Sequence, residues 1–319
     1  MAKGSTRAVV AALAGDGGVA VAKFVAAALS GSTAMLTEAI HSLVDASNQV
    51  VLLVGQKRSK KAADASHPLG YGMEAYFWSF VVALMIFLLG GVLSVYEGML
   101  RILHPTPVTS TWISLAVLAV AAAFEAAAFW VGYREYKRVV RGRPVRLWAF
   151  IKGSKDPNLV SVLLENFAAL IGIGLAASGV IATSFLHIAW ADGAASVAIG
   201  LLLACVAFVL ANETRSLIAG EAVSSIVMER LKEILARGDC ITSVEEIATL
   251  HLGPGAILVA LTLSFRHDAT VDRLNAAIHE MTSGLQSADE RIAYVFVRPV
   301  EGKTRDIQDN HSAKTYAKP

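Results

Sequence analysis

The stretch TAMLTEAIHSLVDASNQ, residues Thr33–Gln49, decides the predicted fold. It lies in an apolar segment, residues 33–55, that is long enough to cross a bilayer. Yet it carries Glu38, His41 and Asp45, and a charged side chain in hydrocarbon costs about 2.5–3.5 kcal/mol on insertion scales. A helix places His41 and Asp45, four residues apart, on one face, where imidazole and carboxylate form a pair that binds divalent metals. The stretch therefore predicts a membrane protein that handles a metal ion inside the membrane.

Composition agrees with a membrane protein. The chain of 319 residues is 55% hydrophobic and only 17% charged, values that suit a protein with several membrane spans. Its two cysteines, Cys205 and Cys240, are too few and too far apart for a disulfide framework or a cysteine metal site. The apolar run after Lys3 and Arg7 continues to Leu29 without a cleavage site, so it predicts a first membrane helix and not a signal peptide.

Two domains and a tail follow from the hydropathy pattern. Residues 1–211 predict an α-helical membrane domain of six transmembrane helices, at 7–29, 33–55, 74–100, 112–133, 157–182 and 190–211. Residues 212–301 predict a soluble α+β domain, with helices at 224–237 and 271–283 and strands at 246–252, 257–266 and 293–298. The order α-β-β-α-β favours helices on one face of a small sheet. Residues 302–319 form a polar tail.

The loops predict the orientation of the membrane domain. Loop 56–66 carries four Lys or Arg residues and loop 134–155 carries eight, whereas 30–32 and 183–189 carry none. The positive-inside rule therefore places both termini in the cytoplasm, most naturally across a bacterial inner membrane, with lipid around the helices. Between membrane spans, the basic runs are not a nucleic-acid interface.

The short connection between the first two segments predicts which of their residues lie at the same depth in the membrane. The connection Ser30–Ser32 is so short that the first two helices must be antiparallel, and reflection through its centre pairs Asp45 with Asp16 and Glu38 with Lys23. The second match predicts a structural ion pair between helices. The first places two carboxylates at one depth, which repel unless a cation or a proton lies between them.

The fifth segment supplies the other half of a predicted metal site. Its middle contains Glu165 and Asn166, of which only one can face a given site because neighbours on a helix point about 100° apart. The predicted ligands are therefore His41, Asp45, Asp16 and Glu165 or Asn166, a set that suits Zn(II) and leaves Fe(II), Mn(II) and Co(II) open. The alternative is a group of buried polar residues that only hydrogen-bond between helices.

Three further polar features keep alternatives open or exclude a class of function. Glu125 could accept a proton, support a metal ligand or pair with another helix. Asp192 is predicted to cap the helix that it opens. The sequence contains no phosphate-binding glycine loop, metalloprotease motif or serine nucleophile elbow, so neither an enzyme nor an ATP-driven pump is predicted, and no cofactor is expected.

Five stretches of the chain resemble a known family. Five stretches are similar to the cation diffusion facilitator family, and in particular to its branch with a mitochondrial zinc transporter: SGSTAMLTEAIHSLVDASNQ (30–49), HPLGYG (67–72), YEGMLRILHP (96–105), KDPNLVSVLLENFAALIG (155–172) and ATLHLGPGAILVALTLSF (248–265). The resemblance implies six membrane helices, a cytoplasmic ferredoxin-like domain, a homodimer and exchange of a divalent metal for protons. In it, His41 and Asp45 match one half of the transport site.

The chain departs from that branch at two positions. The branch usually has Glu-Asp where this chain has Glu165-Asn166, and it commonly has Asn where this chain has Asp16. We interpret the pair as the transfer of one carboxylate from the fifth helix to the first. In the soluble domain His251, His267 and His279 are scattered, so no regulatory metal site is predicted there.

The predicted function is secondary-active efflux of a divalent metal, most suitably Zn²⁺, with protons moved in the opposite direction by alternating access. His41 is the group that would exchange a proton at physiological pH, since an unperturbed imidazole titrates near about 6.5. Two alternatives are a membrane metal sensor that does not transport and a transporter of organic cations, the latter weakened by the lack of aromatic residues around the polar cluster.

Overall fold

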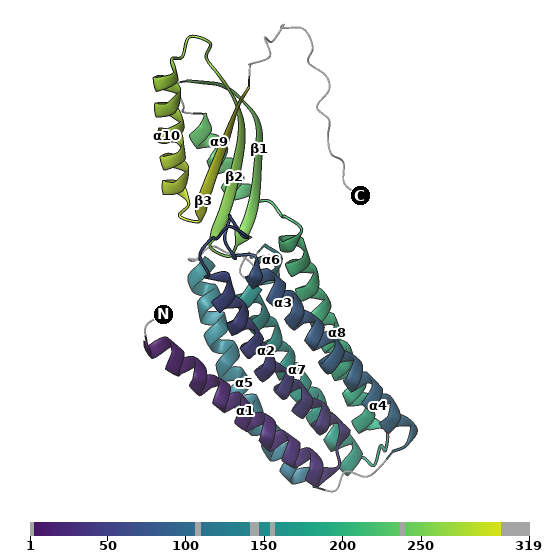
Figure 1. The fold of residues 1–319 in the computed structure, drawn as a ribbon. Helices are drawn as coiled ribbons and strands as arrows, with labels where there is room; N and C mark the ends of the chain where they lie inside the picture. The colour runs from purple at the N-terminus through teal and green to yellow at the C-terminus, as the bar shows by residue number, and fades with distance from the viewer. Residues whose placement is uncertain (1–2, 106–109, 141–146, 154–156, 237–239, 301–319) are drawn as a thin grey trace, which may run out of the picture. The chain divides into compact units, whose positions relative to one another are not determined.

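The computed structural model (Figure 1) describes residues 3–105, 110–140, 147–153, 157–236 and 240–300, and for residues 3–16 it describes the helix backbone alone. The chain divides into two compact units, one of which is helical and extends to Glu221, while the other holds a three-stranded sheet. The predicted tail 302–319 lies outside the described residues.

Long helices form the first unit, as the apolar segments predict. Their bounds are α1 Lys3–Ser30, α2 Thr33–Ser59, α3 Glu74–Met85, η1 Ile86–Val92, α4 Leu93–Leu103, α5 Thr111–Val140, α6 Leu147–Gly153, α7 Pro157–Phe185 and α8 Ala191–Ile218. The elements α3, η1 and α4 are consecutive, and η1 is a π-helical turn within this one long helix. The basic stretch predicted as a loop, 134–155, is partly helical, because α5 continues to Val140 and α6 follows.

Four described helical segments are long and apolar enough to cross a membrane: Glu74–Leu103, Thr111–Arg138, Leu159–Phe185 and Ala191–Ile218. In α1 the described apolar part, Gly17–Ser30, is shorter. The polar residues of α2, which include Glu38, Asp45, Lys57 and Arg58, lower its hydropathy.

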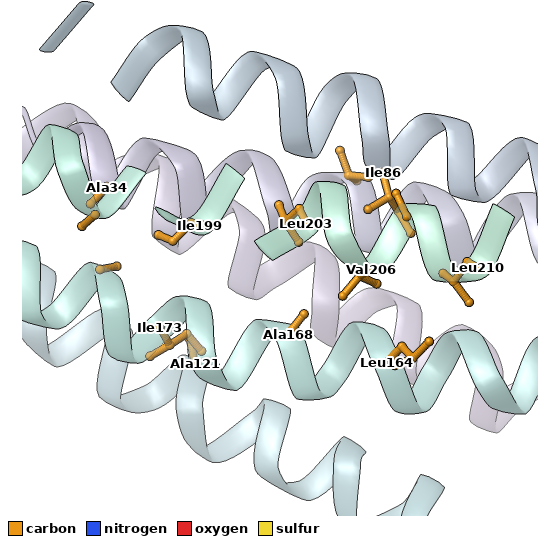
Figure 2. Close-up of a cluster of buried hydrophobic side chains, with 14 of the residues drawn as sticks. Ala34, Ile86, Ala121, Leu164, Ala168, Ile173, Ile199, Leu203, Val206 and Leu210 are labelled. Carbon is orange, nitrogen blue, oxygen red and sulfur yellow. The ribbon is translucent and has the colours of Figure 1, made fainter. Parts of the chain in front are cut away.

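Aliphatic side chains from several helices interlock in the core of the first unit. Figure 2 shows Ile199, Leu203, Val206 and Leu210 of α8 among residues of the neighbouring helices, and these side chains are buried. Glycines let α4 and α8 approach closely: a Cβ on Gly98 would lie 2.7 Å from the carbonyl oxygen of Gly193. Such close backbone contact is a common way for membrane helices to associate.

Asp192 corrects one prediction. It lies in the first turn of α8, but Trp190 occupies the N-cap position of that helix. The Asp192 carboxylate instead accepts hydrogen bonds from the backbone N–H of Thr33 at 2.6 Å and from the Ser32 hydroxyl at 2.5 Å, so it caps α2. Sequence spacing cannot reveal a cap on a helix that is distant in the chain.

A compact loop follows α2. The Asp64 carboxylate accepts hydrogen bonds from Lys61 Nζ at 2.8 Å, the Ser66 hydroxyl at 2.6 Å, the His67 backbone N–H at 2.9 Å and the Tyr71 hydroxyl at 2.7 Å. The His67 and Tyr71 rings stack with centroids 4.0 Å apart. A single carboxylate thus organises residues 61–71.

The second unit has the predicted order α-β-β-α-β. Its elements are α9 Ser225–Leu235, β1 Ile241–Gly253, β2 Ala256–Phe265, α10 Val271–Ala288 and β3 Ile292–Val300, with sheet order β1-β2-β3 and β2 parallel to β3. Alternate β2 residues, including Val259 and Leu261, pack with Leu231 of α9 and Leu285 of α10. Both helices therefore cover one face of the sheet.

Candidate metal site

His41 and Asp45 form the nucleus of the candidate site. They lie one turn apart on α2, with His41 Nε2 3.5 Å from Asp45 Oδ2. The His41 side chain is 2% exposed and the Asp45 side chain 15% exposed, so the pair lies inside the helix bundle. A nitrogen and an oxygen at this separation can approach one small cation together.

Glu165 of α7 interacts electrostatically with Asp45 of this pair. Its side chain is buried, and its Oε1 atom has no hydrogen-bond partner in the part of the chain that the structure describes. The Glu165 carboxylate is close enough to Asp45 of α2 and Glu125 of α5 for their charges to interact. Carboxylates on α2 and α5 therefore lie within electrostatic range of Glu165 on α7, and these like charges repel one another unless a proton or a cation is present.

The neighbouring residue, Asn166, is only partly buried, whereas Glu165 is buried. Of the two alternatives that the sequence leaves open, Glu165 is therefore the more deeply buried, and its charge interacts with that of Asp45. The backbone of Asp16 lies in α1, but its side chain is outside the described residues.

The hairpin prediction for Lys23 and Glu38 is confirmed. Lys23 Nζ lies 3.0 Å from Glu38 Oε2, and both side chains are fully buried. Lys23 also donates a hydrogen bond to the Ser42 hydroxyl at 2.7 Å. A Cβ on Gly172 of α7 would collide with Glu38 Oε1, so α7 packs closely beside the pair at this glycine. Glu38 is therefore committed to an ion pair between α1 and α2.

The described residues do not form a closed metal cage. Among them, no three His, Cys, Asp or Glu side chains are close enough together to hold a metal ion. The structure brings His41 and Asp45 together, and the charge of Glu165 interacts with that of Asp45. In the second unit, His267 and His279 are exposed and lie on different elements.

One residue near this site was missed by the sequence reasoning. Asn48 lies on α2 and is completely buried, and neither its Oδ1 nor its Nδ2 has a hydrogen-bond partner in the described structure. Its spacing of seven residues from His41, two helical turns, was the available signal.

A family model for the cation efflux transmembrane domain matches residues 9–219, which include α2, α7 and the His41–Asp45 pair. The chain belongs to the cation efflux family. This confirms the predicted resemblance to the cation diffusion facilitators. Together with the four apolar helices, membership in the cation efflux family makes the chain an integral membrane protein.

Relatives of this cation efflux protein occur in animals, a plant and bacteria. The human mitochondrial proton-coupled zinc antiporter SLC30A9 is 31% identical over 264 residues, covering 82% of this chain and 46% of the relative. Metal tolerance protein C4 of Arabidopsis thaliana is 28% identical over 243 residues, covering 76% of this chain and 51% of the relative. Magnetosome protein MamM of Magnetospirillum gryphiswaldense is 28% identical over 215 residues, covering 65% of this chain and 61% of the relative. The chain spans about half the length of the first of these relatives.

Proposed function

We propose that this cation efflux protein exports a divalent metal, most suitably Zn²⁺, from the cytoplasm in exchange for protons. The observation that carries the proposal is the buried His41–Asp45 pair with the Glu165 carboxylate within electrostatic range of Asp45. Imidazole nitrogen with carboxylate oxygens suits zinc, and two interacting carboxylates need either a cation or a proton. The name of the human relative, a proton-coupled zinc antiporter, supports the same activity.

The exchange of metal for protons follows because both compete for the same side chains. His41 must be neutral, and Asp45 and Glu165 must be ionised, before they can bind a metal. Protonation of these groups from the outer side expels the ion, and loss of the protons to the cytoplasm restores the site. Because the three side chains come from α2 and α7, a small change in the packing of these helices would alter the coordination, which is what alternating access requires.

The candidate ligands of the proposed site are His41, Asp45, Glu165, Asp16 and Asn166, of which Glu165 and Asn166 are alternatives. The first three are supported by the geometry of α2 and α7, while Asp16 and Asn166 follow from the hairpin reflection and from the departures from the related branch. The lack of three clustered ligands among the described residues supports a site that closes only around the ion.

For the whole molecule, we propose six membrane spans with both termini in the cytoplasm, a ferredoxin-like cytoplasmic domain and a homodimer in a bacterial inner membrane. The predicted boundaries are 1–211 for the membrane domain and 212–301 for the soluble domain, whereas the compact helical unit extends to Glu221. Exposed Trp112 and Trp190, at the starts of α5 and α8, suit the lipid headgroup region. Light scattering of the purified protein should give twice the monomer mass.

Metal-driven proton flux in liposomes tests the function. The full chain, reconstituted with a pH-sensitive dye inside the vesicles, should move protons when Zn²⁺ is added and should also be tested with Fe²⁺, Mn²⁺, Co²⁺ and Cd²⁺. His41→Ala should lower the Zn²⁺-driven flux about tenfold or more, because the site loses its nitrogen ligand. Ser94→Ala, at a buried position on α4, is the control that should keep wild-type flux. Zinc binding without flux by the wild type would favour the sensor instead.

A further inference from the structure

The face of α2 that carries His41 and Asp45 also carries a third polar residue, Asn48. With about 100° between successive residues, His41, Asp45 and Asn48 fall within about 60° of one another around the helix. At about 1.5 Å per residue, Asn48 lies about 10 Å along the axis from His41, and one turn from Asp45. That turn leads toward the end of α2 at Ser59, the end that carries Lys57 and Arg58.

Asn48 is buried in an unusual state. Its side chain is 0% exposed, and in the described structure both its Oδ1 acceptor and its Nδ2 donor have no hydrogen-bond partner. Buried amides normally satisfy both groups, because burial removes the water that would otherwise bind them. On the same face, His41 Nε2 also has no hydrogen-bond partner in the described residues. A leucine would fill a similar volume without this cost, so packing does not account for the amide.

The amide has the chemistry of a neutral site for a hydrated cation. Its Oδ1 can bind a divalent metal or accept a hydrogen bond from a metal-bound water, and its Nδ2 can donate to a carboxylate such as Asp45. Unlike Asp45 and Glu165, it gains or loses no proton when the metal arrives. It can therefore raise the affinity for the metal without changing the number of protons exchanged.

We propose that Asn48 is a further residue of the metal pathway, which holds the partly hydrated divalent cation one turn from His41 and Asp45. It is a positioning residue: it acts on the ion through its water or through the Asp45 carboxylate. The inference rests on the proposed function, because it assumes that a divalent metal passes this face of α2.

The test uses the full-length protein with Asn48→Leu, Asn48→Ser and the control Ser94→Ala, which replaces another fully buried side chain whose hydroxyl has no partner in the described structure. Three quantities are measured: the KM for Zn²⁺ in liposome flux, the Kd for Zn²⁺ by calorimetry in detergent, and the Tm with a chelator present. Asn48→Leu should raise KM and Kd about tenfold. Its metal-free Tm should equal or exceed that of the wild type, and its proton-to-metal ratio should not change. Asn48→Ser keeps an oxygen, so its KM and Kd for Zn²⁺ should lie between those of the wild type and those of Asn48→Leu.

Two results would overturn the inference. Unchanged KM and Kd in both Asn48 variants would make the amide a structural remnant. A lower metal-free Tm in both variants would mean that Asn48 binds a group within the protein. If the wild type itself shows no Zn²⁺-driven flux, then the proposed function has failed, and the wild-type control separates that failure from one of Asn48.

Discussion

At the scale of single residues, the membrane part of this protein separates two uses of buried charge. Lys23 and Glu38 neutralise each other at 3.0 Å and leave no charge for a ligand. The like charges of Asp45 and Glu165 instead interact with each other, and His41 Nε2 lies 3.5 Å from Asp45 Oδ2. An ion pair stabilises a fold, whereas buried carboxylates that repel one another favour a bound proton or cation.

If the proposed site needs a fixed number of carboxylates, one of them can move from Asp16 of α1 to position 166 of α7. Asp16→Asn removes one negative charge from the proposed site, and Zn²⁺-driven proton flux should fall about tenfold or more. The double variant Asp16→Asn/Asn166→Asp should recover most of the flux, because the carboxylate returns to α7. Asn166→Asp alone serves as the control for added charge. A fully active Asp16→Asn protein would refute the transfer of the carboxylate between helices.

The Lys23–Glu38 ion pair predicts an effect on the stability of the fold and not on transport. Lys23→Met leaves Glu38 buried without a counter-charge, and the free energy of unfolding should fall by about 3–5 kcal/mol. Lys23→Met/Glu38→Met should regain most of it, because apolar side chains of similar volume replace a buried ion pair with little cost. Unfolding in a graded series of sodium dodecyl sulfate concentrations measures this. Equal stability of the single and double variants would contradict the ion-pair role.

At the scale of elements, prediction succeeded where chemistry is local and failed where it depends on contacts distant in sequence. The helices, the element order α-β-β-α-β and the pairing of Lys23 with Glu38 follow from periodicity and from a short hairpin. The capping of α2 by Asp192 joins positions that are 159 residues apart, and no spacing reveals it. Asn48 was missed for a related reason, since its burial shows only after the helices pack.

The loop after α2 is an element whose stability should depend on pH. Hydrogen bonds from Lys61, and then from Ser66 and Tyr71, lower the pKa of the Asp64 carboxyl below its ordinary value. Because the folded pKa is the lower one, the carboxylate stabilises the loop above its ordinary pKa of about 4, and this contribution is lost as pH falls through the folded value. At neutral pH, Asp64→Asn should increase hydrogen exchange at residues 61–71, while Asp268→Asn in the second unit should not. Unchanged exchange in Asp64→Asn would show that the carboxylate does not organise the loop.

At the scale of the whole molecule, function depends on which side of the membrane each loop occupies. Export through a site carried by α2 and α7 requires loop 56–66 in the cytoplasm and loop 183–189 outside, as the positive-inside rule predicts. Four described helical segments are apolar enough to span on their own, whereas α2 carries charged residues that other helices must cover. In the proposed topology of six spans, the second helix would cross as part of the bundle, and α1 would supply the remaining span.

Thiol labelling in intact bacterial cells tests this topology. In a background with Cys205 and Cys240 replaced by serine, single cysteines would be introduced as Leu186→Cys, Lys60→Cys and Lys3→Cys. Leu186 and Lys60 are both exposed, so a membrane-impermeant maleimide can reach either position from its own side. Only Leu186→Cys should label in intact cells, and all three should label after permeabilisation. Labelling of Lys3→Cys in intact cells with Lys60→Cys protected would leave the amino terminus outside. The first two helices would then contribute an odd number of crossings, and the shared depth of Asp16 and Asp45 would no longer hold.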